Sequence, residues 1–284
     1  MPLFLNIRIG DHSPIRIFRN NGTTFDDVTE AFGLQNSTGW WNCVVAGDLN
    51  GDGYPDIVAG NAGGNSFFQS SVDNPVQIVS KDFDNNGSVD PIITYYNDFD
   101  KERFIVHNRL VLIDQVPKVK GRFETFTQYA TTPFSQAFPK EELDGAFIAS
   151  AQKLESVILV NRVGKGFDMV DLPDIAQIST IHDIIIDDVD NDGHVDLILT
   201  GNNYDQETLF GRYDAALGLV LRGDGNFNWT RIPHYESGLL TDRNARYMKL
   251  LTSGNGRKTL LISNNNDSLQ FFVYRGADQL TLSK

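Results

Sequence analysis

Residues 188–196 read Asp-Val-Asp-Asn-Asp-Gly-His-Val-Asp, and the stretches at 48–56 and 82–90 repeat the same spacing. Each stretch has an oxygen-bearing side chain at its first, third, fifth and ninth positions and a glycine at its sixth. A short apolar run follows each stretch, and such runs are typical of buried strands when β-branched residues are frequent. The runs are 57–59, 92–94 and 197–200. The sequence therefore predicts three acidic loops, each leading into a buried β-strand.

The spacing within each loop suits calcium, which takes about six to eight oxygen ligands at about 2.3–2.6 Å. Side chains at positions 1, 3 and 5 can curl around one point, and glycine at position 6 allows a sharp turn without Cβ strain. Position 7 offers its backbone carbonyl, and position 9 closes the shell with a carboxylate. Magnesium is less favoured because it demands stricter octahedral geometry. We predict about three Ca²⁺ ions, one in each loop.

The predicted ligands are Asp48, Asn50, Asp52, Tyr54 and Asp56 in loop one, Asp82, Asp84, Asn86, Ser88 and Asp90 in loop two, and Asp188, Asp190, Asp192, His194 and Asp196 in loop three.

Two alternatives to these calcium loops can be weighed from the sequence. An EF-hand begins with the same pattern but requires a bidentate Glu at position 12 and flanking helices. Position 12 is Ala59, Ile93 or Leu199, none of which has a side chain that binds a cation. A metal-free turn is the other alternative, because Asn, Asp and Gly all favour turns. Three copies with one spacing favour the metal, since the four carboxylates of loop three repel one another without a cation.

Composition narrows the class of protein. The 284 residues carry a formal net charge of −13, which argues against nucleic-acid binding through clustered Lys and Arg. No apolar run is long enough to predict membrane insertion. Residues 1–10 lack a basic region followed by an apolar stretch, so no signal peptide is visible. Cys43 is the only cysteine, and we interpret it as a buried small hydrophobe that forms no internal disulfide.

A second pattern lies upstream of loops one and three. Residues 19–25 and 161–167 each place Asn and Gly ahead of a Phe, after the apolar strands expected at 15–18 and 157–160. The repeating unit is then a strand, a Gly turn, a Phe-bearing strand, a connection, a strand, an acidic loop and a strand. Such a unit spans about 45–50 residues, the size of a four-stranded propeller blade.

A further copy of the Gly turn occupies 219–227, and its loop is expected near residue 251. The residues that align with positions 1, 3, 5 and 9 are Leu251, Ser253, Asn255 and Thr259, so no carboxylate remains. The apolar strand at 260–262 persists. We predict that this blade keeps the fold and lacks the metal.

These units together predict an all-β protein, a β-propeller of four-stranded blades with about five blades in a single domain spanning 1–284. The interval 96–147 has mixed or helical patterning and is predicted to be an insertion. Residues 3–9 alternate as a strand does, and we expect them to pair with the C-terminal strand near 271–274, which would protect sheet edges.

The Asn–Gly turn before Phe, the acidic loop and its apolar strand together resemble the FG-GAP/VCBS repeat of integrin-like β-propellers. The segments 176–177, 201–202 and 211–218 resemble a VCBS-repeat branch met in Bacteroidetes-type proteins. The resemblance implies a propeller, often seven-bladed, with calcium between two strands of a blade. It also implies an extracellular, cell-surface or periplasmic protein of adhesion or carbohydrate handling. This chain is short for seven blades, so it is either part of a larger propeller or a smaller or open one.

No catalytic motif accompanies the loops. None of the five histidines has a zinc-binding spacing, and no nucleophile elbow or phosphate-binding loop is present. We therefore predict no catalytic residues and a non-enzymatic, calcium-stabilised module that binds a protein or glycan. A calcium-dependent, polysaccharide lyase-like enzyme and a lectin remain alternatives, because fold does not fix function.

Trp40 and Trp41 present a further choice. They provide either core packing, which we favour, or a stacking platform for a sugar. Adjacent strand residues face opposite sides, so at most one of the two joins a given face.

Overall fold

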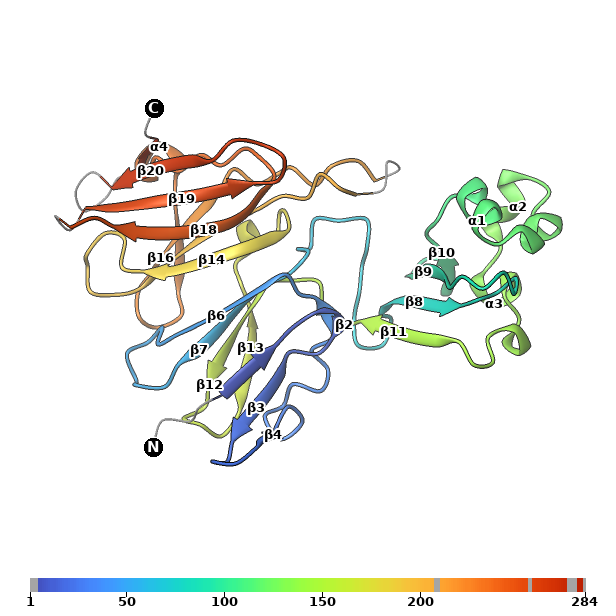
Figure 1. Cartoon of the computed structure of the whole chain (residues 1–284), viewed down its shortest axis with the longest axis horizontal. Coiled ribbons are helices and arrows are strands. Elements are labelled where there is room, and N and C mark those ends of the chain that lie inside the picture. The colour runs from blue at the N-terminus through green and yellow to red at the C-terminus, as the bar shows by residue number, and fades with distance from the viewer. Residues whose placement is uncertain (1–4, 207–209, 255–256, 275–279, 283–284) are drawn as a thin grey trace.

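The computed structural model describes residues 5–206, 210–254, 257–274 and 280–282. Across these residues the strands form five antiparallel sheets of three or four strands, here called sheets I to V, and one short two-stranded pair (Figure 1). No sheet closes on itself. The predicted all-β, propeller-like fold is confirmed.

Sheet I has the order β1 (Leu5–Arg8), β3 (Arg16–Asn20), β4 (Phe25–Asp27). Sheet II has the order β6 (Cys43–Gly47), β7 (Asp56–Gly60), β12 (Val157–Asn161), β13 (Phe167–Asp171). Sheet III has the order β11 (Phe147–Ala151), β8 (Val76–Lys81), β9 (Asp90–Asn97), β10 (Glu102–Ile105). Sheet IV has the order β14 (Ile181–Asp187), β15 (Asp196–Gly201), β16 (Leu219–Gly223), β17 (Trp229–Ile232). Sheet V has the order β18 (Ala245–Thr252), β19 (Lys258–Asn264), β20 (Gln270–Tyr274), β21 (Leu280–Leu282). The pair is β2 (Asp11–Ser13) with β5 (Gly39–Trp40).

The helices are short. They are α1 (Arg109–Gln115), α2 (Phe126–Thr131), α3 (Phe134–Ala137) and α4 (His234–Ser237), with 3-10 turns η1 (Pro117–Arg122), η2 (Lys140–Glu142) and η3 (Asp174–Ala176). Over the described part of the chain, none is long and apolar enough to cross a membrane.

The strands that follow loops one and three are the second strands of their sheets. Every residue of β7 and of β15 is buried, which confirms the strands predicted after these loops. A strand with apolar side chains on both faces is stable only where both faces of its sheet are covered. The continuous apolar runs therefore place these two strands in the middle of stacked sheets.

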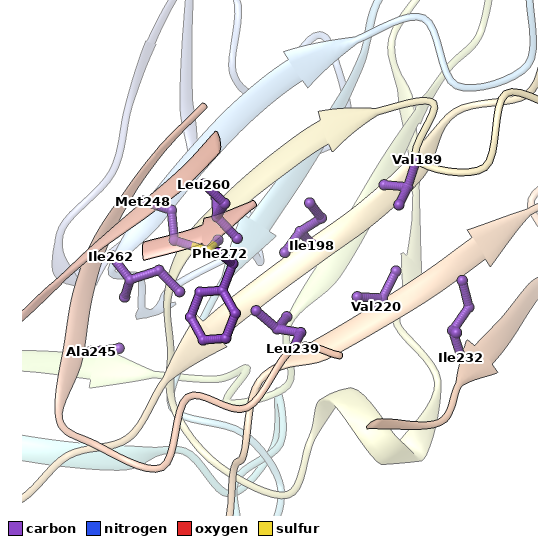
Figure 2. Packing of buried hydrophobic residues seen from close by; sticks show 10 residues of the cluster. All are labelled: Val189, Ile198, Val220, Ile232, Leu239, Ala245, Met248, Leu260, Ile262 and Phe272. Atoms are coloured by element: carbon purple, nitrogen blue, oxygen red, sulfur yellow. The ribbon is translucent and has the colours of Figure 1, made fainter. Parts of the chain in front are cut away.

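Three hydrophobic clusters supply that cover by joining four sheets in succession. One cluster joins sheets I and II, a second joins sheets II and IV, and a third joins sheets IV and V. In the third cluster, Met248, Leu260 and Phe272 of sheet V pack towards Ile198 and Val220 of sheet IV (Figure 2). The first strands also touch, β6 with β14 and β14 with β18. The result is a row of face-packed blades.

Sheet III lies outside this row, at the right of Figure 1, and meets it through β11 against β2 and β5. Residues 61–156 run between β7 and β12, which are paired neighbours in sheet II, so sheet III is inserted within a blade. The insertion predicted at 96–147 is therefore wrong in its boundaries: its two ends belong to strands β9 and β11. Local patterning missed this because the β8–β9 hairpin carries an acidic loop like those of the blades, and only long-range pairing separates them.

Strand pairing corrects a second prediction. The N-terminal strand was expected beside 271–274, but β1 pairs with β3, and Ile7 lies opposite Ile17. β20 has β19 and β21 as its neighbours. The repeating unit read from the sequence also spans two sheets, since β3 and β4 belong to sheet I whereas β6 and β7 belong to sheet II.

Behind β7, a buried polar network fixes the place where the chain leaves and re-enters sheet II. The side-chain oxygen of Asn61 accepts the amides of Trp40 (3.1 Å) and Ala62 (2.8 Å). Its amide nitrogen donates to the carbonyls of Lys153 (2.9 Å) and Glu155 (3.2 Å). Asn61 thus ties the start of the inserted segment to its end.

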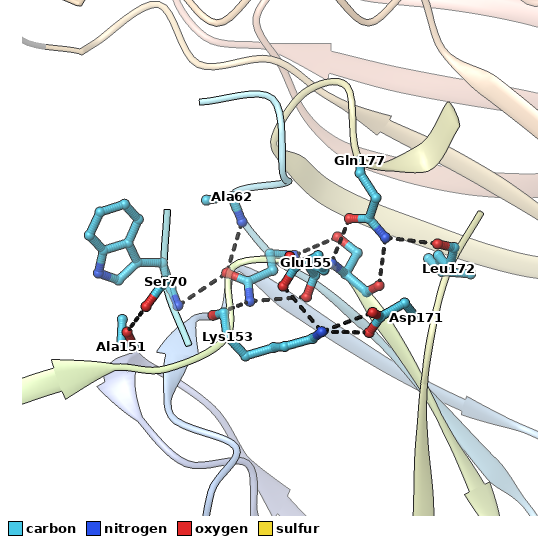
Figure 3. Close-up of polar contacts among 11 residues, drawn as sticks. Ala62, Ser70, Ala151, Lys153, Glu155, Asp171, Leu172 and Gln177 are labelled. Atoms are coloured by element: carbon cyan, nitrogen blue, oxygen red, sulfur yellow. Dashed lines mark hydrogen bonds and ion pairs between the residues drawn. The ribbon is translucent and has the colours of Figure 1, made fainter. Parts of the chain in front are cut away.

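A second amide side chain continues this network. Gln177 accepts the amide of Ser156 (2.8 Å) and donates to the carbonyls of Ser156 (2.9 Å) and Leu172 (3.0 Å). Figure 3 shows Gln177 reaching Leu172, with Lys153 beside Asp171 and Glu155. The bonds from Asn61 to Trp40, Lys153 and Glu155, and from Gln177 to Ser156, join segments more than 20 residues apart, so the network holds sheets together as well as local turns.

Asn61→Ala is expected to destabilise the fold by about 2–4 kcal/mol, because buried backbone donors and acceptors lose their partner. Urea unfolding would measure the loss. Asn65→Ala is the matched control, since Asn65 is exposed and donates a single bond to the carbonyl of Ile178 (3.0 Å). Equal effects from the two variants would contradict the role given to the buried network.

Candidate functional site

The three acidic loops share one pattern of backbone hydrogen bonds. The amide at position 6 donates to the carboxylate at position 1: Gly53 to Asp48 (2.8 Å), Gly87 to Asp82 (2.9 Å) and Gly193 to Asp188 (3.1 Å). The amide at position 7 donates to the position 5 side chain at 2.7–2.8 Å in all three loops. These bonds curl the loop so that its oxygens gather on the inside.

The backbone conformations explain two residue preferences in the loops. The glycine at position 6 has φ between 83° and 91° in all three, a region that residues with a Cβ seldom enter. Position 4 is also left-handed, with φ of 75° at Gly51, 61° at Asn85 and 59° at Asn191. Gly and Asn are the residues that tolerate this region best. The Gly or Asn at position 4 of each loop is therefore a second sequence signal for the turn, beyond the glycine at position 6.

The aspartate at position 9 anchors each loop to the core. Asp56, Asp90 and Asp196 are at most 3% exposed, and each accepts the amide of position 2 at 2.8–3.1 Å. Burial raises the pKa of all three carboxyl groups. A buried carboxylate is costly unless a cation or several donors compensate it.

In sheets II and IV the same aspartate also reaches the third strand. Its second oxygen accepts the amide of Asn161 (2.8 Å) in sheet II and of Gly223 (3.0 Å) in sheet IV. Asn161 in turn donates to the carbonyl of Pro55 (2.8 Å) and accepts the amide of Gly164 (2.7 Å). The Asn–Gly turn and the acidic loop, two separate signals in the sequence, therefore form one structural unit.

The residue at position 2 of each acidic loop has a structural role that the sequence pattern of ligands does not include. Its side chain is Leu49, Phe83 or Val189, and each is buried with at most 5% exposure. The signal was an apolar residue at the same place in three otherwise acidic stretches. This side chain holds the loop down on the core while its neighbours at positions 1 and 3 face outward.

Two of the loops bring three carboxylates to one point. One oxygen from each of Asp82, Asp84 and Asp90 lies within 4.8 Å of the others, and Asp188, Asp190 and Asp196 form an equivalent cluster. Two ligands on opposite sides of one calcium ion are about 5 Å apart, so these separations match a shared cation. One buried oxygen of Asp188, Oδ1, has no hydrogen-bond partner. The residues present thus fit a divalent cation at positions 1, 3 and 9.

The structure does not bring the remaining predicted ligands into a carboxylate cluster. Asp192, at position 5, lies outside the carboxylate cluster of loop three and accepts the amide of His194. Loop one has the same hydrogen bonds but an amide, Asn50, at position 3. The backbone carbonyls of Tyr54, Ser88 and His194 stay predicted ligands, as does the full coordination shell of each loop.

Loop three has an internal competitor for the metal. Nε of Arg222, on β16, lies 2.5 Å from Oδ2 of Asp190. Among the described residues, the acidic side chains of loops one and two take part in no ion pair. A cation at loop three must therefore share Asp190 with the guanidinium group, so this loop should bind calcium more weakly than its four carboxylates suggest.

The fourth hairpin differs as predicted from its residues. β18 ends at Thr252 and β19 begins at Lys258, so the connection is shorter than the acidic loops. Leu251 and Thr259, aligned with positions 1 and 9, lie opposite each other within the strands. Asn255, aligned with position 5, lies outside the described residues. The blade keeps its strands, and the absence of metal there stays a prediction.

The two tryptophans face different parts of the fold, and the core-packing role is confirmed for Trp41. Trp41 is 3% exposed and packs in the cluster between sheets I and II. Trp40 is half-buried and faces the junction with sheet III, where its ring meets Phe68 edge-on. Cys43 is half-buried rather than fully buried, and burial raises the pKa of its thiol to about 12.

Family comparisons match the region that holds loops one and two. A model described as FG-GAP-like repeat matches residues 4–59, and a model described as FG-GAP repeat matches residues 41–89. Residues 4–89 are therefore similar to FG-GAP repeats. The matched segment runs from sheet I through loop one to loop two, so the repeat spans sheets in the way that the strand pairing shows.

A comparison of the chain with curated proteins finds no match. Among solved structures, NanB plus Optactamide matches with 10% identity and a TM-score of 0.38, over 98% of this chain and 48% of that chain. The chain thus spans about half the length of that structure.

Proposed function

We propose that this protein is a calcium-stabilised, non-enzymatic binding module, in which metal ions in the acidic loops stiffen the hairpins of a recognition scaffold. The observation that carries the proposal is the convergence of three carboxylates in loops two and three. Positions 1, 3 and 9 would hold the ion, which would supply the positive charge that neutralises them.

The position 9 aspartates support a structural role for the ion. Each bridges an acidic loop to the core, and two of them also bond to the third strand of the sheet. A cation beside a buried carboxylate offsets its desolvation. Metal binding would therefore be transmitted directly into the sheets, and unfolding would release the ions.

An exported location agrees with this function, since FG-GAP proteins are typically extracellular or at the cell surface. Adhesion or glycan recognition would be the corresponding task. The lyase-like alternative requires a cationic cleft that faces an open calcium position. Three recesses among the described residues are lined by no residue of the acidic loops, so we favour binding over catalysis.

Calcium stoichiometry tests the proposal directly. Titration of chelator-treated protein, followed by calorimetry, should show about three calcium ions per chain with weak competition from magnesium. Asp48→Ala, Asp82→Ala and Asp188→Ala should each remove one site, because position 1 supplies both a ligand and the acceptor for the turn. No calcium uptake, or uptake unchanged in all three variants, would refute the proposal.

A further inference from the structure

A recess lies where sheet III meets the row of blades. It has a volume of about 370 Å³ and draws its walls from three places: the β2–β5 pair, sheet III and the segment that follows β15. That segment leaves β15 and returns through a bridge in which Asn203 and Tyr213 exchange two backbone hydrogen bonds of 2.7 and 2.8 Å. None of the acidic loops contributes to the recess.

One wall of this cavity is aromatic. Trp40 and Phe68 meet with ring centroids 4.9 Å apart, and Phe68 and Phe210 meet at 5.6 Å. Trp40 is fixed further by its indole N–H, which donates to Nε2 of His12 (3.0 Å). This bond makes Nε2 an acceptor, and burial lowers the pKa of His12, so its ring is neutral near pH 7. The aromatic wall is therefore rigid and uncharged.

Apolar side chains of Ala62, Ile93 and Val106 also line the cavity, and polar groups occupy the remainder. Asp11, Asn42, Asn203 and Gln206 supply a carboxylate and three amide side chains. Among the described residues no Lys or Arg lines the cavity, although the chain has 24 of these residues. Amide side chains both donate to and accept from hydroxyl groups, and the carboxylate of Asp11 accepts from them, whereas an anionic ligand would meet the charge of Asp11 without a partner. The lining thus selects against phosphates and acidic sugars.

We propose that this cavity is a binding site for a neutral saccharide. A pyranose has an apolar C–H face that fits an aromatic wall and a rim of hydroxyl groups that fits amides and a carboxylate. The volume is within the usual range for small-ligand sites. The inference rests on the proposed binding function and names its ligand class.

Binding can be measured on the full chain in millimolar calcium. Saturation-transfer NMR with a panel of glucose, galactose, mannose, xylose, N-acetylglucosamine, lactose and cellobiose should detect at least one ligand. Glucuronate, galacturonate and sialic acid should give no signal. Titration of the tryptophan fluorescence should then give the affinity for the best sugar, because Trp40 lines the site.

Variants test whether the sugar occupies this cavity. Gln206→Ala and Asp11→Ala lie on the rim, so they should fold normally and weaken binding by about tenfold each, since each removes a hydrogen-bond partner. Trp40→Ala should abolish binding. Gln35→Ala and Tyr235→Ala are matched controls, because both residues are exposed and lie outside the cavity, and both variants should bind as the parent does.

Four outcomes would overturn the inference. Preferential binding of an acidic sugar would contradict the uncharged lining, and sugar binding unchanged in the rim variants would place the site elsewhere. Failure of all neutral sugars to bind, in protein whose melting midpoint still depends on calcium, would reject the saccharide site and leave the calcium-stabilised module standing. Binding of apolar peptides alone would make the cavity a protein-docking site.

Discussion

Removal of calcium is expected to lower the melting midpoint of this protein by more than about 10 °C, the largest effect that we predict. A site held at 100 times its Kd adds about 2.7 kcal/mol to the free energy of unfolding. For a chain above about 200 residues, each kcal/mol shifts the midpoint by roughly 2–4 °C. Three loops filled in millimolar calcium would together exceed the stated shift. Calorimetry in calcium and in excess chelator would measure it.

Magnesium provides the control for this experiment. It demands octahedral geometry and retains its waters, so it should restore only a small part of the lost stability. Full recovery with magnesium would indicate a general charge effect in place of a calcium site. An unchanged midpoint in chelator would mean that the loops hold their shape through the hydrogen bonds of Asp48, Asp82 and Asp188 alone, against the proposed function.

Asp196→Ala is expected to destabilise the protein by about 2–5 kcal/mol even in chelator. The side chain is fully buried and accepts the amides of Val189 (2.8 Å) and Gly223 (3.0 Å). Its loss leaves two buried donors without partners, in addition to removing a proposed calcium ligand. Urea unfolding with and without calcium separates the two contributions, because the hydrogen-bonded part does not depend on the metal.

Two further variants serve as comparisons for the stability loss expected in Asp196→Ala. Asp192→Ala changes an exposed residue of the same loop, so it should lower stability only when calcium is present. Asp90→Ala removes the equivalent residue of loop two, which among the described residues accepts the backbone amide of Phe83 (2.9 Å) and no third-strand amide, so its metal-independent cost should be smaller than that of Asp196→Ala. Loss of stability in Asp196→Ala that vanishes entirely in chelator would contradict the anchoring role of position 9.

Local sequence signals were sufficient where one short stretch forms one structure. Residues that are close together in the sequence were enough to predict three features. These are the acidic loops, the left-handed glycines at position 6 and the buried strands β7 and β15. The strands of the fourth hairpin followed in the same way, whereas the absence of metal there, predicted from Leu251 and Thr259 at positions 1 and 9, stays a prediction.

Contacts distant in sequence could not be inferred in that way. Loop two has the same residue types as loop one, yet β8 and β9 belong to a sheet inserted within a blade. The cavity at the junction escaped notice because its lining comes from residues as far apart as Asp11 and Tyr213. The sequence offered only the pair Trp40 and Trp41, without showing which of the two faces the core.

The sequence by itself determined the local chemistry of this protein: which stretches turn, which strands are buried and which oxygens can converge on a cation. These features depend on φ preferences, on spacing along one chain segment and on apolar runs, all of which a single stretch contains. Tertiary structure alone decided that β12 returns to β7 after residues 61–156, that Arg222 reaches Asp190, and that three separate segments enclose one cavity. Such arrangements depend on which buried faces pack together, and the free energy of that packing is shared by residues that no local pattern connects.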